Sequence, residues 1–224
     1  MEHGGEALVS LSKAIADAVE SVSPSIVRVD GRGRHPASGV VYAPEMVLTA
    51  NHALKRDEDV AVVAGDGSSL PARLAGRDHA TDLAVLRVDG LGVEAATPAL
   101  EPARVGEISV AVGRSFRDDG PRATLGIVSA VGGPLRMGRG LRLERYLQTD
   151  AAPLSGGGAL VNARGAVIGV PVASLRRGTM LAVPADVAWE AAKALQSGGT
   201  ARRGYLGILS QPANIPDTQR AGFD

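Results

Sequence analysis

Cysteine is absent from the 224-residue sequence, and aromatic residues are few: two Phe, one Trp and three Tyr. The lack of cysteine excludes a disulfide scaffold, a thiolate enzyme and a cysteine-ligated zinc site. An excess of charge is also lacking, because 24 Lys and Arg balance 24 Asp and Glu. Nucleic acids are bound mainly through phosphate charge, so this balance argues against a nucleic-acid partner. Any chemistry must therefore come from Ser, His, Asp, Glu, Lys or backbone groups, around a core of Val, Leu, Ile and Ala.

The sequence also lacks a long apolar run, since none approaches the ~18 residues that a membrane span requires. No membrane span is therefore expected. At the N-terminus, Met1–Gly5 contains no Lys or Arg of the kind that open a signal peptide, and Glu6–Val22 includes the charged residues Lys13 and Asp17. The sequence as given predicts a cytoplasmic protein, whereas an additional leader upstream would direct it to the cell envelope or periplasm.

Glycine is abundant, with 29 residues, and 13 prolines accompany it. These residues separate about a dozen short runs rich in β-branched residues, from Ser25–Val29 to Thr179–Val183. Long helical segments do not alternate with the runs, so an antiparallel all-β barrel or sandwich is favoured over a parallel α/β sheet. Two helices are expected to flank the strands. One is Glu6–Ser21, whose apolar residues recur at helical spacing, and the other runs from Pro184 to Gln196.

Three segments carry residues suited to nucleophilic catalysis. His52 follows a buried strand, Asp82 immediately precedes another, and Ser155 opens a run of three glycines. Each residue alone has an ordinary structural explanation: a histidine packed at a strand end, a turn-capping Asp, and a flexible glycine turn. Their order of His, Asp and Ser is that of a two-barrel serine protease, in which the Asp orients the imidazole and the imidazole activates the Ser. A β-rich interaction domain with accidental motifs is the remaining alternative.

Several motifs make the sequence resemble the HtrA/Deg family of trypsin-like serine proteases. The matching segments are Pro24-Ser-Ile-Val-Arg-Val, Ala37-Ser-Gly-Val-Val-Tyr, Val47-Leu-Thr-Ala-Asn-His, Thr81-Asp-Leu-Ala-Val-Leu, Thr124-Leu-Gly-Ile-Val-Ser, Gln148-Thr-Asp-Ala-Ala and Gly158-Ala-Leu-Val-Asn. The resemblance implies two six-stranded antiparallel β-barrels, divided near residues 95–105, within a protease domain of residues 24–197. Residues 1–23 would form an N-terminal helical segment, and residues 198–224 a linker and the start of a truncated PDZ domain.

The resemblance implies His52 as the general base and Asp82 as its orienting carboxylate. The nucleophile has two candidate positions, because the loop after Gln148-Thr-Asp-Ala-Ala is shorter than the family pattern. If Ser155 is the nucleophile, Pro153 two residues earlier has no N–H for an oxyanion hole, which would then use the N–H groups of Ser155 and Gly156. If Gly156 holds the nucleophile position, the hydroxyl is missing.

The function implied by the resemblance is a serine endopeptidase that hydrolyses unfolded or damaged proteins through an acyl-enzyme. An extended substrate is expected to pair with the strand that contains Val170, Val172 and Ala173, with a preference for small aliphatic P1 residues. The alternative is a catalytically inactive protease-fold protein that binds peptides. No cofactor or metal is expected. The family's assembly through N-terminal segments implies a homotrimer, in which Glu6–Ser21 serves either assembly or docking on the body.

Overall fold

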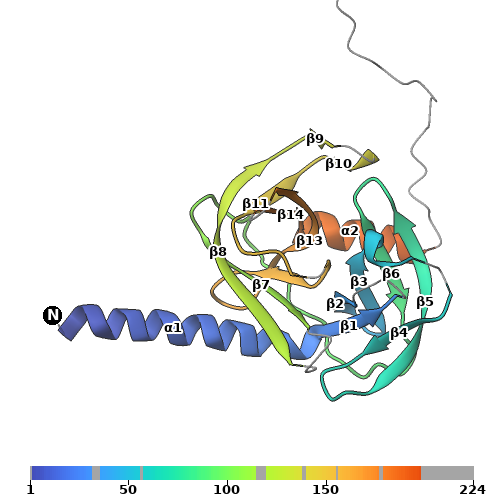
Figure 1. Ribbon diagram of the computed structural model, residues 1–224, viewed down its shortest axis with the longest axis horizontal. Coiled ribbons are helices and arrows are strands. Elements are labelled where there is room, and N and C mark those ends of the chain that lie inside the picture. Colours follow the sequence, from blue (N-terminus) through green and yellow to red (C-terminus); the bar gives the residue numbers. More distant parts are fainter. Residues whose placement is uncertain are drawn as a thin grey trace, which may run out of the picture.

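Two closed β-barrels and two flanking helices make up the part of the chain that the computed structural model describes (Figure 1). The described residues are 2–31, 36–55, 58–114, 120–137, 140–154, 156–176 and 179–197. This architecture confirms the expected two six-stranded antiparallel barrels with an N-terminal and a C-terminal helix. Residues 198–224, where a linker and the start of a PDZ domain were expected, lie outside the described residues.

The first barrel contains six strands in the order β1-β2-β3-β6-β5-β4. Their bounds are β1 Ile26–Asp30, β2 Ala37–Ala43, β3 Met46–Ala50, β4 Val60–Val63, β5 Ser69–Asp78 and β6 Leu83–Arg87. Apolar residues such as Val27, Val47 and Leu86 fill its interior and are fully buried. Because these buried β-branched and aliphatic side chains fill the interior, the sheet closes into a barrel without an aromatic core.

The second barrel follows a linker and has the strand order β11-β14-β13-β12-β7-β8. Its strands are β7 Ile108–Arg114, β8 Pro121–Gly132, β11 Tyr146–Thr149, β12 Ala159–Val161, β13 Val167–Arg176 and β14 Thr179–Pro184. A small hairpin of β9 (Leu135–Arg136) and β10 (Arg142–Leu143) stands apart from the barrel. Neither of these two-residue strands was expected, because so short a pairing leaves no alternating pattern in the sequence.

A shared apolar cluster joins the barrels, and helix α2 (Ala185–Gln196) covers part of it (Figure 1). Leu48 of β3, Val112 of β7 and Leu195 of α2 belong to this cluster and are almost fully buried. The half-buried Trp189 ring meets Tyr42 of the first barrel edge to face, with 6.2 Å between ring centroids. Helix α2 therefore leaves the second barrel and returns to pack on the first, so that one apolar cluster fixes the relative placement of both.

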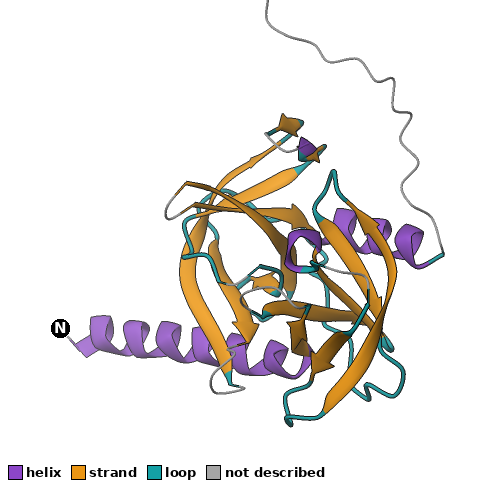
Figure 2. Ribbon diagram, turned by 45° about the vertical axis from the view of Figure 1, so that its right-hand side comes forward, coloured by secondary structure: helices purple, strands orange, loops and turns teal. Residues whose placement is uncertain are grey.

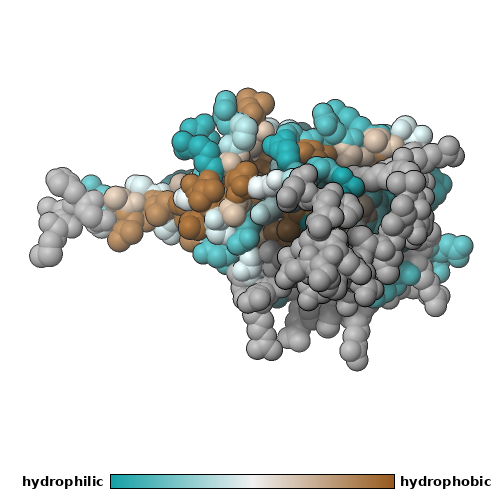
Figure 3. Space-filling view, turned by 90° about the horizontal axis from the view of Figure 1, so that it is seen from above, coloured by the Kyte–Doolittle hydropathy of each residue, from teal (hydrophilic) through white to brown (hydrophobic). Residues whose placement is uncertain are grey.

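Helix α1 (Glu2–Val22) extends away from the barrels, while strands and loops make up most of the body (Figures 1 and 2). It begins earlier than the expected Glu6–Ser21 helix and ends before Pro24. Ile15 and Val19 pack on the shared cluster, but Leu8 and Val9 each remain 69% exposed. Figure 3 shows brown, apolar side chains along this helix. Among the described residues, no helix is long and apolar enough to cross a bilayer.

Candidate active site

Pairing of β3 with β6 brings His52 and Asp82 together at one end of the first barrel. The register sets Ala50 opposite Leu83, so the residues that follow β3 and precede β6 lie side by side. His52 lies in a short 3-10 turn after β3, and the Asn51 N–H donates to the Asp82 carbonyl at 2.8 Å. Asp82 takes a left-handed backbone conformation with φ of +58°, which Asp tolerates better than most residues and which turns the chain into β6.

Asp82 holds His52 through both carboxylate oxygens. The His52 backbone N–H donates to Oδ1 at 2.8 Å, and the ring Nδ1–H donates to Oδ2 at 2.5 Å. Because an ionised carboxylate only accepts hydrogen bonds, the proton of the neutral imidazole resides on Nδ1. The other ring nitrogen, Nε2, is then an acceptor and is available as a base. The His52 side chain is 54% exposed and that of Asp82 only 14%, so the pair presents the imidazole outward.

The hydrogen bond to Asp82 raises the pKa of His52 above 6.5, because the carboxylate stabilises the imidazolium form. Partial burial of the ring and the positive charge of Lys55 oppose this rise in the pKa. The rise in the pKa means that the His52 imidazole stays protonated to a higher pH than an unperturbed histidine.

The glycines after residue 155 attach the second barrel to the first. Gly157 forms a parallel bridge with Ser38 of β2, and the Ser38 N–H donates to the Gly156 carbonyl at 2.9 Å. The hydroxyl of Thr49, on β3, donates to the Ser38 carbonyl at 2.7 Å. Gly157 has φ of +79°, and a Cβ there would overlap the Ser38 carbonyl oxygen. These contacts of Gly156 and Gly157 with Ser38, supported by Thr49, form a seam that joins the two barrels beside His52.

Gly156 lies directly opposite the His52 ring. A Cβ added to Gly156 would lie 2.7 Å from Nε2 and 3.0 Å from Cε1 of His52. Of the expected site residues, the structure therefore brings together His52, Asp82 and Gly156. Ser155, expected as a nucleophile and as an oxyanion-hole donor, lies outside the described residues. Ser38 and Thr49 were missed by the sequence analysis, although two buried polar residues within apolar strands are a recognisable signal of a specific hydrogen-bonding role.

The segment before residue 155 is held against β8. The Thr124 hydroxyl donates to the Ala152 carbonyl at 2.7 Å, and the Ile127 N–H donates to Asp150 Oδ1 at 2.7 Å. Gly126 permits this approach, because a Cβ there would overlap the Ala151 nitrogen. The chain is thus anchored both before and after the short loop that faces His52.

Strand β13 contains Val170, Val172 and Ala173, the three residues that were expected to bind substrate. Val170 and Val172 are buried, with 0% and 2% of the residue surface exposed, and Ala173 is half-buried. Strand β13 pairs with β14 along its length, but within the described residues its pairing with β12 is confined to Gly169 and Val167. Among the described residues, β13 beyond Gly169 is therefore paired on one side only.

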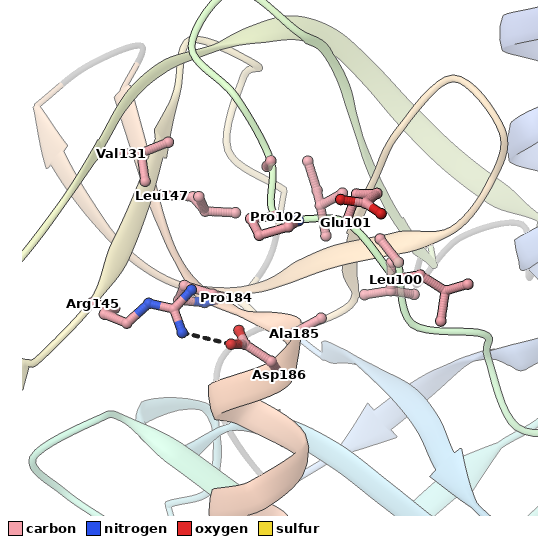
Figure 4. Close-up of a pocket in the computed structure, with 13 residues that line it drawn as sticks. Leu100, Glu101, Pro102, Val131, Arg145, Leu147, Pro184, Ala185 and Asp186 are labelled. Carbon is pink, nitrogen blue, oxygen red and sulfur yellow. Dashed lines mark hydrogen bonds and ion pairs between the residues drawn. The ribbon is translucent and has the colours of Figure 1, made fainter.

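The cavity in Figure 4 is separate from this site. It measures about 90 Å³ and is lined by linker residues such as Leu100 and Pro102, together with Leu147 of β11. An ion pair between Arg145 and Asp186, with Nη1 donating to Oδ2 at 2.5 Å, lies beside it. Neither His52 nor Asp82 contributes to its lining. Among the described residues, no group of three His, Cys, Asp or Glu side chains is arranged to hold a metal ion.

Residues 37–170 match the trypsin-like peptidase domain family. The chain is 35% identical over 199 residues to a probable periplasmic serine endoprotease DegP-like of Pseudomonas savastanoi pv. phaseolicola, covering 84% of this chain and 40% of that protein. It is 37% identical over 206 residues to the periplasmic pH-dependent serine endoprotease DegQ of Escherichia coli, covering 83% of this chain and 44% of that protein. The chain thus spans about two fifths of the length of these curated relatives.

Solved structures agree with the sequence matches. A variant of the HtrA-type protease AlgW, solved with a tripeptide, superposes with a TM-score of 0.78 at 31% identity, covering 93% of this chain and 72% of that chain. The similarity extends over both barrels rather than over one motif, and it coincides with the family match across residues 37–170. The chain therefore belongs to the trypsin-like peptidase family, and within it to the HtrA-type serine proteases.

Proposed function

We propose that this chain binds extended, unfolded polypeptide between its two barrels without forming a serine acyl-enzyme. The observation that carries the proposal is the position of Gly156, where a side chain would begin 2.7 Å from His52 Nε2. In a serine protease this nitrogen takes the proton of the nucleophilic hydroxyl, so the nucleophile must lie opposite it. Glycine has no hydroxyl, and loss of the nucleophile lowers the rate of peptide hydrolysis by about 10⁶-fold in comparable enzymes.

Polypeptide binding does not depend on that hydroxyl. The edge of β13 near Val170, Val172 and Ala173 is the proposed docking strand, on which backbone hydrogen bonds supply affinity. Because Pro171 lacks an N–H, it removes one donor from this edge and restricts the register of the bound chain. The tripeptide in the structure of the AlgW variant supports peptide binding as a property of related proteins.

A second candidate function is serine endopeptidase activity with Ser155 as the nucleophile. The intact pair of His52 and Asp82 favours it, because these residues are the base and the orienting group of such an enzyme. His52 would take the Ser155 proton, and the alkoxide would attack a peptide carbonyl whose oxygen faces the N–H groups of Ser155 and Gly156. His52 would then protonate the leaving amine, and water would hydrolyse the acyl-enzyme.

Two measurements separate the candidates. The first is labelling of the wild-type chain with a fluorophosphonate, followed by mass spectrometry, with Ser155→Ala as the matched control. We expect no adduct at residue 155, whereas an adduct that disappears in Ser155→Ala would establish the endopeptidase. The second is binding of unfolded casein, measured by fluorescence anisotropy while checking that the casein remains uncleaved. We expect saturable binding and no casein fragments, and an absence of binding would contradict the proposed function.

We also propose a homotrimer assembled through α1, and the division into residues 1–23, 24–197 and 198–224. The exposed apolar residues Leu8, Val9 and Leu11 on α1 support an assembly role, since such side chains are usually covered. Light scattering of wild type and Leu8→Asp tests it: three copies are expected for wild type and one for the variant. The curated relatives are named as periplasmic, which supports the periplasm as the compartment in which this site works.

A further inference from the structure

Arg114, the last residue of β7, is buried although it carries a positive charge. Only 7% of its surface is exposed. Its guanidinium reaches the N-terminal segment, where Nε donates to the Ile26 carbonyl of β1 and Nη2 donates to the Ser23 carbonyl at 3.0 Å. Because a charge is costly to bury unless it is hydrogen-bonded, these two bonds hold the end of β7 against β1 and the segment that precedes it.

The backbone of the same residue binds Ser38, which is fully buried on β2 of the first barrel. The Arg114 N–H donates to Ser38 Oγ at 2.9 Å. Gly113 leaves the space for this contact, because a Cβ on Gly113 would lie 2.7 Å from that oxygen. On its other side, the Ser38 N–H donates to the Gly156 carbonyl at 2.9 Å. The second barrel therefore holds Ser38 from two sides, at Arg114 and at Gly156.

We propose that Arg114 is a positioning residue, which sets how closely Gly156 approaches the His52 ring and ties that approach to the placement of the N-terminal segment. The path begins at the Ser23 carbonyl, which holds the Arg114 guanidinium. It continues from the Arg114 N–H to Ser38, and from Ser38 to Gly156. The inference shares with the proposed function the placement of Gly156 opposite His52, but it depends neither on the polypeptide that binds nor on whether the chain hydrolyses it.

The pKa of His52 reports the position of Gly156. The hydrogen bond to Asp82 raises this pKa, and partial burial of the ring opposes the rise. Gly156 contributes to that burial, because a Cβ added to it would lie 2.7 Å from Nε2. Withdrawal of Gly156 would uncover the ring, so the pKa of His52 would rise further. A loss of stability that leaves Gly156 in place would not change it.

Arg114→Met tests the inference, because methionine has an unbranched apolar side chain but no donor. Trp189→Ala is the matched control, since it weakens the packing of α2 but takes part in none of the hydrogen bonds of the path. Nuclear magnetic resonance gives both amide hydrogen exchange and the pKa of His52. In Arg114→Met we expect the Ser38 amide to exchange at least about tenfold faster relative to the other amides of β2, and the pKa of His52 to rise.

The control and the conservative variant define the outcomes. We expect neither change in Trp189→Ala, and we expect Arg114→Lys, which keeps the charge and one donor group, to lie between wild type and Arg114→Met. If the Ser38 exchange or the His52 pKa of folded Arg114→Met equals that of Trp189→Ala, the inference is overturned. Ser38→Ala provides the test if Arg114→Met does not fold. It removes the acceptor of the Arg114 N–H, and an unchanged pKa of His52 would also overturn the inference.

Pro24→Gly tests the link to the N-terminal segment. Pro24 lies in the 3-10 turn η1 (Ser23–Ser25), and glycine gives this turn more backbone freedom. We expect Pro24→Gly to raise the pKa of His52 in the wild-type background and to add little in Arg114→Met, or in Ser38→Ala where that variant replaces it. No rise in wild type, or additive effects in the double variant, would contradict the link. Such a result together with retained casein binding would contradict this inference and leave the proposed function standing.

Discussion

Gly157→Ala tests whether the seam between the barrels requires glycine. With φ of +79° at Gly157, an alanine costs roughly 1–2 kcal/mol in backbone conformation. Its Cβ would also overlap the Ser38 carbonyl oxygen and lie 2.8 Å from the Thr49 hydroxyl oxygen. The seam would have to open, which disrupts the hydrogen bonds from Ser38 N–H to Gly156 and from Thr49 to Ser38. Each bond contributes about 0.5–1.5 kcal/mol, so the free energy of unfolding should fall by about 2–5 kcal/mol in total.

Gly67→Ala is the matched control for this prediction. Gly67 has φ of +84°, nearly that of Gly157, but no atom lies within 4 Å of the Cβ that would be added. We therefore expect Gly67→Ala to lower the free energy of unfolding only by the conformational cost of about 1–2 kcal/mol. Urea unfolding, followed by fluorescence of Trp189, the single tryptophan, gives both values. Equal losses in the two variants would refute the argument from close approach at the seam.

Three other predictions concern the site and the packing around it. A nuclear magnetic resonance titration should place the pKa of His52 above 6.5 and lower it in Asp82→Asn, since the hydrogen bond to Asp82 is the largest cause of the rise; an unchanged pKa would contradict this assignment. Because the folded-state pKa is raised, the ion pair should stabilise the protein fully below about pH 6.5 and lose its contribution as pH rises through the folded pKa. Trp189→Ala should lower the free energy of unfolding by about 2 kcal/mol or more, measured by circular dichroism, because α2 loses its ring contact with Tyr42; no change would mean that the contact is dispensable.

Much of the fold was predictable because the strand signals are local. Short apolar runs flanked by turn residues appear as strands with the expected bounds, as for Val60–Val63 after Asp59 and Ala159–Val161 between Gly158 and Asn162. The proximity of His52 and Asp82 followed from the order of the motifs, and the pairing of β3 with β6 accounts for it. Both predictions depend on patterns that extend over several residues, so an error of one residue in the alignment does not change them.

The residue opposite His52 could not be predicted from the sequence, because a change of one residue in the alignment of the loop decides which residue it is. Ser155 and Gly156 are adjacent, and the shortened loop leaves both alignments open. The pairing of Ser38 with Gly157 sets the register, through a contact between residues far apart in the sequence. Arg114 is a similar case: it ends β7, yet its Nη2 donates to the Ser23 carbonyl at 3.0 Å and so helps to join the N-terminal segment to the second barrel.

The three consecutive glycines differ in what requires them. At Gly157 and Gly158, a positive φ and a close carbonyl oxygen exclude a side chain, so the approach of the two barrels demands glycine. Gly156 has no such left-handed backbone, and the atoms that a side chain would meet first belong to the end of the His52 side chain, whose displacement would strain the hydrogen bond to Asp82 and not the barrels. The fold therefore tolerates a serine at residue 156. The lack of a hydroxyl there concerns the chemistry of the site and not the construction of the barrels, which is why Gly156→Ser is expected to change reactivity while leaving the seam intact.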